Sequence, residues 1–249
     1  MGINRSESVK FLLLRPQAKY QKSSQRFLQA GLNTVGLGLI DTVTDQQALS
    51  QLALKIDNLD PHSMLIVTST VAAELITQSN YRWPGEIKIF AVGNSTGRIL
   101  ANIGFKPIIP DQASTEGLLA LPELNQVKQK KIIVIKGHGG RKDLIEQLCQ
   151  RHAKVEQWQL YRRVRVSKPN CSEDWQAAQI NCIIATSGEL IEAAFEHFDS
   201  KWLQTVSWIV VSKRTADMAA KLGVERIFVS SDASDDALIK CAKHISERA

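Results

Sequence analysis

Short, unbroken apolar runs alternate with helix-length segments along the whole chain, and this alternation constrains the fold more than any other feature. The runs are rich in Ile, Val and Leu, which is typical of strands covered on both faces. The segments between them carry apolar residues at helical spacing. The pattern predicts an α/β fold with parallel sheets and helices on both faces. The predicted strands are residues 9–14, 64–68, 87–92, 131–135, 181–185, 207–211 and 226–229.

A series of short motifs occurs twice in the same order. Residues 64–69 (MLIVTS) match 182–187 (CIIATS), residues 91–96 (AVGNST) match 210–215 (VVSKRT), and residues 114–118 (STEGL) match 234–238 (SDDAL). The members of these pairs are 118, 119 and 120 residues apart. Self-similarity of this kind is the sign of an internal repeat. We therefore expect two similar α/β domains, in which Ser114 and Ser234 begin helices.

Two extended segments at equivalent positions of the repeat differ from the buried strands. Residues 34–42 contain two glycines within an apolar run, and residues 155–166 alternate between apolar and polar. Along the second segment Trp158 and Leu160 face one way, and Tyr161 faces the other way with the arginines. We expect both segments to cross between the domains, with Tyr161 on the polar, basic side of its strand and outside any core.

The composition excludes several classes of function. The chain has 249 residues and a formal net charge of +6, but it lacks basic runs with interleaved aromatics, so nucleic acid is not an expected partner. No apolar run is long enough to span a membrane and the first residues lack a signal sequence, so we expect a cytoplasmic protein. The four cysteines and five histidines lack metal-ligand spacing, so no metal is expected.

The carboxyl ends of the predicted strands are where an α/β protein binds ligands. The Thr-Ser pairs ending at Ser69 and Ser187 fall there, and so do the turns that lead to Thr96 and Thr215. A cleft between two similar domains is a preferred ligand site. Cations and glycines follow the other strands in the same way, as the sequences of residues 15–16 (RP) and 136–141 (KGHGGR) show.

Together these motifs resemble the uroporphyrinogen-III synthase family of tetrapyrrole biosynthesis. The resemblance rests on their order and spacing from residue 9 to the C-terminal helix, and it includes residues 161–163 (YRR) and 211–216 (VSKRTA). It implies two parallel-sheet α/β domains joined by a two-stranded linker. The first domain comprises residues 1–38 and 167–249, the second comprises residues 39–166, and the crossovers lie near 34–42 and 155–166.

The resemblance also implies the reaction. Enzymes of this family are lyases that use neither cofactor nor metal. They close hydroxymethylbilane, an open tetrapyrrole, into uroporphyrinogen III with inversion of ring D and loss of water. Because the bilane closes without an enzyme to the uninverted isomer, the main task is to hold one geometry. The resemblance further implies a monomer, and the deaminase is a candidate for handing over the substrate.

Roles for individual residues follow from the same resemblance. Tyr161 matches the tyrosine that the family places beside the cleft, and it is a candidate general acid for the departing hydroxide; the alternative is a packing tyrosine in the linker. The candidate partners of the substrate's carboxylates are Arg15, Ser69, Gly93, Asn94, Thr96, Lys136, Gly137, Arg141, Ser187, Arg214 and Thr215.

Structural roles remain open for most of these residues. Hydroxyls at helix starts commonly cap the helix, and exposed cations are often only solvated. His138, a lone histidine in a glycine-rich loop, is interpreted as a bystander. A non-catalytic two-lobed protein that binds an anionic metabolite is the alternative to an enzyme.

Overall fold

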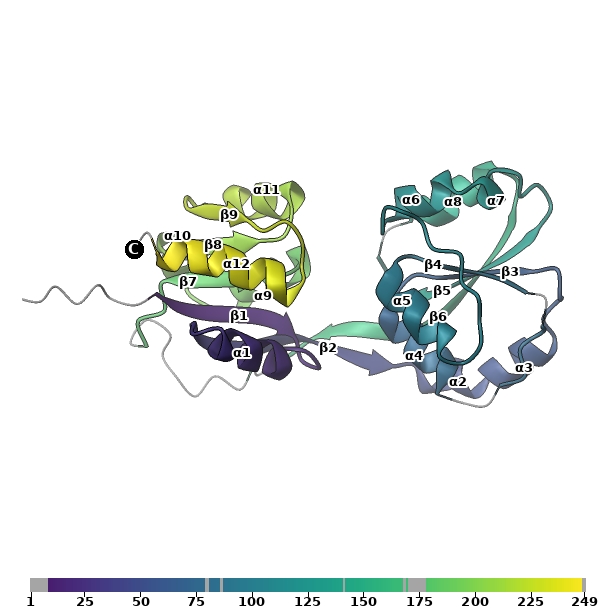
Figure 1. Cartoon of the computed structure of the whole chain (residues 1–249), viewed down its shortest axis with the longest axis horizontal. Helices are drawn as coiled ribbons and strands as arrows, with labels where there is room; N and C mark the ends of the chain where they lie inside the picture. Colours follow the sequence, from purple (N-terminus) through teal and green to yellow (C-terminus); the bar gives the residue numbers. More distant parts are fainter. Residues whose placement is uncertain are drawn as a thin grey trace, which may run out of the picture. The chain divides into compact units, whose positions relative to one another are not determined.

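The computed structural model describes residues 9–78, 81–85, 87–140, 142–167, 169 and 178–247. The chain divides into two compact units. Unit 1 comprises Met1–Thr42 and Val164–Ala249, and unit 2 comprises Val43–Arg163. The division falls within the two long strands that cross between the units (Figure 1).

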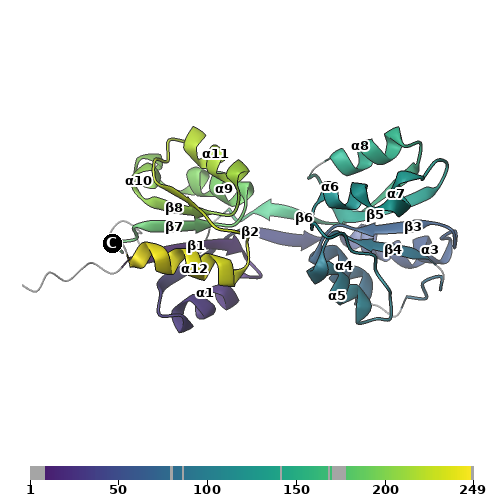
Figure 2. The same ribbon diagram turned by 45° about the horizontal axis from the view of Figure 1, so that its top comes forward.

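Unit 1 is a parallel sheet with helices on both faces. Its strands follow the order β2-β1-β7-β8-β9. In Figure 2, α1 and α12 cover one face of this sheet and α9, α10 and α11 the other. The elements are β1 (Lys10–Pro16), α1 (Tyr20–Gln29), β2 (Asn33–Thr44), β7 (Cys182–Ala185), α9 (Gly188–His197), α10 (Ser200–Thr205), β8 (Ser207–Val210), α11 (Lys213–Lys221), β9 (Ile227–Val229) and α12 (Asp235–Ser246).

Unit 2 has the same layers. Its strands are parallel and follow the order β4-β3-β5-β6. Helices α2 to α5 pack on one face and α6 to α8 on the other. Figure 2 shows α4 and α5 on one side of the strands and α6 to α8 on the other side. The elements are α2 (Gln46–Ser50), α3 (Leu52–Asp57), β3 (Met64–Val67), α4 (Thr70–Thr77), β4 (Lys88–Ala91), α5 (Asn94–Ala101), α6 (Thr115–Ala120), α7 (Pro122–Asn125), β5 (Lys131–Gly137), α8 (Asp143–Gln150) and β6 (Lys154–Arg165).

The unbroken apolar runs are the buried strands. All four residues of β3 and of β7 are buried, as are the four residues 132–135 of β5. Each sheet has a hydrophobic cluster on either face, and each of the four clusters is confined to one unit. Full burial of one Leu, Ile or Val side chain contributes about 1.5–3 kcal/mol. The sequence pattern therefore reflects burial on both faces, and the predicted α/β class is confirmed.

The internal duplication is visible in the strand order. Read outward from the crossover strand, unit 1 runs β2-β1-β7-β8 and unit 2 runs β6-β5-β3-β4, with matching connections along the chain. β9 pairs Phe228 with Ile209 beyond β8, and an isolated parallel bridge between Ile108 and Phe90 takes the equivalent place beyond β4. The expected repeat of one α/β unit is confirmed.

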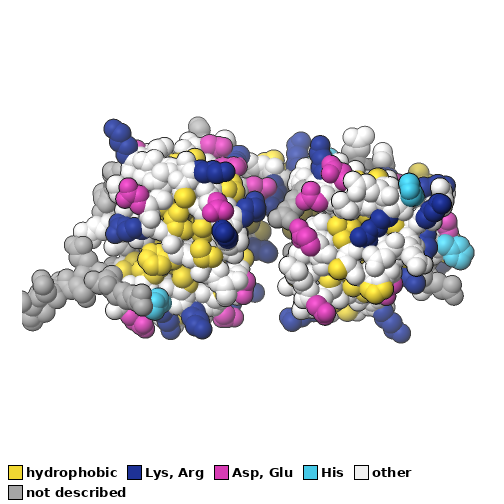
Figure 3. Space-filling model, turned by 90° about the horizontal axis from the view of Figure 1, so that it is seen from above, with side chains coloured by type: hydrophobic (Ala, Val, Ile, Leu, Met, Phe, Trp, Pro, Cys, Tyr) yellow, Lys and Arg dark blue, Asp and Glu magenta, His cyan; other side chains and the backbone are white. Residues whose placement is uncertain are grey.

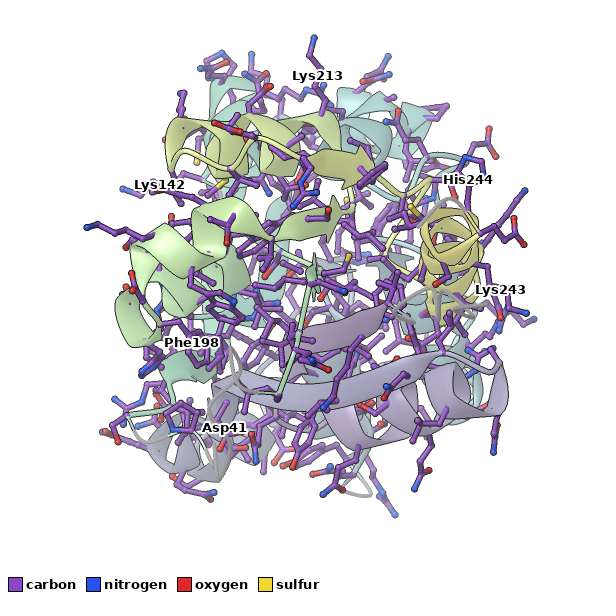
Figure 4. All side chains as sticks on the ribbon, turned by 90° about the vertical axis from the view of Figure 1, so that its left-hand side faces the viewer. Asp41, Lys142, Phe198, Lys213, Lys243 and His244 are labelled. Carbon is purple, nitrogen blue, oxygen red and sulfur yellow. The ribbon has the colours of Figure 1, made fainter. Side chains whose placement is uncertain are left out.

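The helix ends follow the signals seen in the sequence. Ser114 and Ser234 are the N-caps of α6 and α12, and each accepts a hydrogen bond from a backbone N–H group of the first turn. Gly223, just beyond α11, has a φ of 90°, which side chains with a Cβ rarely adopt. Lys243 and His244, labelled in Figure 4, lie in the last turn of α12, where cations complement the helix dipole.

Candidate functional site

Tyr161 is buried, contrary to the alternation expected along its strand. Its side chain is 5% exposed and belongs to a hydrophobic cluster of unit 2 together with Trp158 and Leu160. The reason is a β-bulge, because Lys136 pairs with Gln159 but the next residue, Gly137, pairs with Tyr161. The extra residue shifts the register, so that Leu160 and Tyr161 are both buried. The prediction that Tyr161 lies outside a core is wrong.

The ring and the hydroxyl of Tyr161 are both held in place. The hydroxyl donates a hydrogen bond to Ser69 Oγ at 3.0 Å. The ring lies against Gly137, where an added Cβ would be 2.6 Å from Cε2 and 2.7 Å from Cζ. Any other residue at position 137 would collide with the ring, so glycine is needed here for close approach. The structure thus brings together three of the predicted site residues, Ser69 after β3, Gly137 at the end of β5 and Tyr161 within β6.

Ser69 begins α4 just after β3. Besides the tyrosine hydroxyl, its Oγ accepts the backbone N–H group of Ala72 at 3.0 Å. A serine hydroxyl accepts up to two hydrogen bonds and donates one. Tyr161 and Ala72 therefore use both acceptor positions of Ser69 Oγ, and the hydroxyl proton of Ser69 points toward neither of these two groups. Ser187, the equivalent residue in unit 1, caps α9 through the N–H group of Leu190 at 3.4 Å.

The second pair of turns starts α5 and α11. Gly93 is the N-cap of α5, Asn94 is exposed, and Thr96 is 3% exposed in the first turn. Thr215 is 2% exposed and forms a capping box with Ser212, since each side chain bonds the other residue's backbone N–H group at 3.0–3.2 Å. Thr96 and Thr215 are thus buried in the first turns of α5 and α11. The exposed side chains of these turns include those of Asn94 and Arg214.

The predicted cations have different surroundings. Arg214 is exposed, and its Nη1 lies 3.9 Å from Met218 Sδ. The same atom would lie 3.9 Å from a Cβ added to Gly188, so the guanidinium is near the start of α9. Lys136 is half-buried at the end of β5, and desolvation lowers the pKa of its ammonium group. Arg141 lies outside the described residues.

Arg15 is buried inside unit 1 and is only 7% exposed. Its guanidinium forms an ion pair with Asp235 at the start of α12. Asp235 also accepts a hydrogen bond from Ser23 Oγ at 2.9 Å and pairs with Arg26 at 3.4 Å. Arg15 was predicted to follow the first strand, but it lies within β1, next to its last residue, and its contacts join β1, α1 and α12 to one another.

His138 has a partner that the sequence analysis did not identify. Its Nε2 lies 3.0 Å from Asp45 Oδ2. Asp45 is the N-cap of α2, and its Oδ1 accepts the N–H group of Ala48 at 2.9 Å. These two hydrogen bonds, that from Ala48 first, lower the pKa of Asp45. Aspartate before a helix is a recognisable cap signal, but nothing in the sequence connects residues 45 and 138.

The described residues contain neither a group of three potential metal ligands nor a helix long and apolar enough to cross a membrane. On the face drawn in Figure 3, Lys and Arg side chains are interspersed with Asp and Glu. On that face the cations are therefore not gathered in one area.

Comparison with known proteins identifies the family. Residues 21–240 match the family model described as uroporphyrinogen-III synthase HemD. The uroporphyrinogen-III synthases of Escherichia coli (strain K12) and Salmonella typhimurium (strain LT2) are 29% and 28% identical to this chain, and each match covers 93% of this chain and 99% of the relative.

Solved structures agree on the fold. Uroporphyrinogen-III synthetase from Helicobacter pylori 26695 superposes with a TM-score of 0.65, and a mutant uroporphyrinogen III synthase from the extremely thermophilic bacterium Thermus thermophilus with 0.63. Both are 15% identical, and the matches cover 95% and 96% of this chain and 99% of each structure. Since the family model spans most of the sequence and the fold agrees throughout, the chain belongs to the uroporphyrinogen-III synthase family.

Proposed function

We propose that this chain is a uroporphyrinogen-III synthase, a lyase that closes hydroxymethylbilane to uroporphyrinogen III with inversion of ring D and loss of water. The observation that carries the proposal is the family match over residues 21–240. The tyrosine held at the carboxyl edge of unit 2 gives the reaction a candidate acid. The proposed activity needs a shaped, hydrogen-bonding surface, because the competing uncatalysed closure is already fast.

Tyr161 is the proposed general acid for the departing hydroxide. Its hydroxyl donates to Ser69 Oγ, whose acceptor positions are filled by Tyr161 and Ala72, so the serine proton is available to a ligand. A proton can therefore pass from the tyrosine through the serine to a leaving oxygen that binds at Ser69. Loss of the hydroxyl then leaves a cation conjugated with a pyrrole, and the substituted carbon of the last ring attacks it.

The acetates and propionates of the substrate are the proposed ligands of the helix starts and nearby cations. Backbone N–H groups at the starts of α4, α5, α9 and α11 favour anions. Arg214 lies in the first turn of α11 and near Gly188, and Lys136 follows Ile135, which pairs with the last residue of β3 before α4; both are proposed to add charge-assisted hydrogen bonds. Arg141 stays a predicted contact, while Arg15 is already paired with Asp235 and is given a structural role.

The test is a coupled assay in which the deaminase makes the bilane from porphobilinogen and the ratio of isomers III and I is read. We expect isomer III from the wild-type protein. In the Tyr161→Phe variant we expect the rate of isomer III formation to fall by about 10²- to 10⁴-fold, the range that general acids contribute. Isomer I alone at saturating protein would exclude the activity, and bilane binding without isomer III would identify a non-catalytic binding protein.

The oligomeric state, the location and the handover of substrate are further parts of the proposal. We expect a cytoplasmic monomer, and sedimentation of the purified chain at micromolar concentration checks the oligomeric state. Direct handover predicts that the deaminase raises the yield of isomer III beyond that from the same amount of free bilane. Equal yields from the two sources would exclude handover.

A further inference from the structure

The backbone around Tyr161 is fixed by two hydrogen bonds. The N–H group of His138 donates to the carbonyl of Tyr161 at 2.7 Å, and the N–H group of Asp45 donates to the carbonyl of Leu160 at 2.9 Å. They join the turn after β5 and the end of β2 to the part of β6 that carries the tyrosine. Because Gly137 lies under the ring, the position of this turn also fixes the space available to the ring.

Unit 1 contains the same two backbone bonds at the equivalent positions. Gln17 N–H donates to the carbonyl of Ile40 at 2.7 Å, and Val166 N–H donates to the carbonyl of Leu39 at 3.0 Å. The β-bulge is also repeated, since Arg15 pairs with Gly38 and Pro16 with Ile40. The duplicated fold therefore builds this backbone arrangement in unit 1 without a hydrogen-bonded side-chain pair of the Asp45–His138 kind.

The side chains differ between the two copies. In unit 2 the residues that donate the backbone bonds, Asp45 and His138, also contact each other through their side chains at 3.0 Å. Their counterparts in unit 1, Val166 and Gln17, cannot form such a pair, because valine has no polar side-chain group. The copy with the Asp45–His138 hydrogen bond is the one with the tyrosine, because Ile40 stands at the position of unit 1 that is equivalent to Tyr161.

We propose that Asp45 and His138 are positioning residues for Tyr161, an inference that rests on the proposed function. Asp45 is well placed to anchor the pair, because its Oδ1 is held by the N–H group of Ala48 while its Oδ2 accepts the N–H group of His138 Nε2. The pair holds the turn at residues 137–138 against the ring, so that the tyrosine hydroxyl stays directed at Ser69. Misplacement of a reacting group by about 1 Å can cost as much as two orders of magnitude in rate.

A double-mutant cycle on the full-length protein tests this role. We expect His138→Ala and Asp45→Asn each to lower kcat for isomer III about tenfold, with KM within about twofold, because the defect lies in the orientation of an acid rather than in binding. In a Tyr161→Phe background the same substitutions should cost less than about twofold, since they act through the missing hydroxyl. Asp45→Asn keeps an oxygen for the cap of α2, which guards against loss of folding.

Lys131→Gln serves as the matched control. Lys131 pairs with Glu156 at 3.3 Å at the opposite ends of the same two strands, β5 and β6, so its loss should leave kcat unchanged. The inference would be overturned if both variants kept the wild-type kcat, or if each substitution lowered kcat by the same factor with and without the tyrosine hydroxyl. In either case, isomer III formation by the wild type would still support the proposed function. A wild type that yields only isomer I would overturn both.

Discussion

At the residue scale, the ring of Tyr161 lies so close to Gly137 that there is no room for a side chain at residue 137. A methyl group at residue 137 would lie 2.6 Å from the ring. The ring is confined by its hydrophobic cluster and by its hydrogen bond to Ser69. We therefore expect Gly137→Ala to displace the tyrosine, to lower the rate of isomer III formation at least tenfold and to cost about 1–3 kcal/mol of stability. The coupled assay and urea unfolding measure these effects.

Gly85→Ala is the control for the glycine substitution. Nothing lies within 4 Å of a Cβ added there, so activity and stability should stay at the wild-type level. Wild-type activity in Gly137→Ala would show that the ring can move without consequence, and it would contradict the importance of the tyrosine's position.

The buried ion pair of Arg15 carries a prediction about pH. Burial, the largest influence, acts to raise the pKa of Asp235, but the hydrogen bonds from Ser23 and Arg15 and the nearby charges together lower it. A carboxylate whose pKa is lower in the folded state contributes stability above its unfolded-state pKa of about 3.9, and this contribution is lost as the pH falls through the folded-state pKa.

Asp235→Asn should accordingly lower the free energy of unfolding at pH 7, and the difference from the wild type should shrink as the pH falls below about 4. Urea unfolding at pH 7, 4 and 3 measures the difference. Asp236→Asn is the control, because the side chain of Asp236 is 81% exposed and should contribute little. A difference that stays constant with pH would contradict the assigned role of the Asp235 carboxylate.

At the scale of the elements, the helix starts keep their backbone geometry in both copies while their residues differ. Ser69 and Ser187 both have φ of −159°, with ψ of 157° and 160°. Gly93 and Ser212 are likewise extended, but only Ser212 has a side chain that can cap. The turn geometry is therefore set by the strand–helix connection, and the capping side chain adds stability where it is present.

The capping box of α11 makes this stability measurable. We expect Thr215→Ala and Ser212→Ala each to cost about 1 kcal/mol. The double variant should cost clearly less than the sum, because both substitutions break the same reciprocal hydrogen bonds. Urea unfolding measures the three values, and Thr77→Ala, at the last turn of α4, is a control expected to stay within about 0.5 kcal/mol of the wild type. Strictly additive losses would contradict the shared box.

At the scale of the whole molecule, the features that repeat along the sequence were predicted, and contacts between residues far apart in the sequence were missed. Continuous burial and the repeated motifs are local signals, so strands, fold class and duplication followed from them. The face of Tyr161 was predicted wrongly because a single bulge shifts the register. The pairing of Arg15 with Asp235 joins residues separated by 220 positions, and that of Asp45 with His138 joins residues separated by 93. No periodicity reports such contacts.

The division of the cores between the two units predicts how fragments of the chain behave. Both hydrophobic clusters of unit 2 consist of residues from within Val43–Arg163, a continuous stretch. Unit 1 is discontinuous, and β1, the strand between β2 and β7, comes from its N-terminal segment. We therefore expect the fragment 43–163 to fold alone with one cooperative urea transition, followed by the fluorescence of Trp83 and Trp158.

The fragment 164–249 is the control for this prediction, and we expect it to be unfolded. Without β1 its sheet loses the strand that pairs with β7 through residues 11–14, and the clusters on both faces lose the buried side chains of that strand. Adding the peptide 1–42 should restore cooperative unfolding, because it supplies β1, α1 and most of β2. A 43–163 fragment without a cooperative transition would mean that unit 2 depends on unit 1 for its stability, despite its self-contained core.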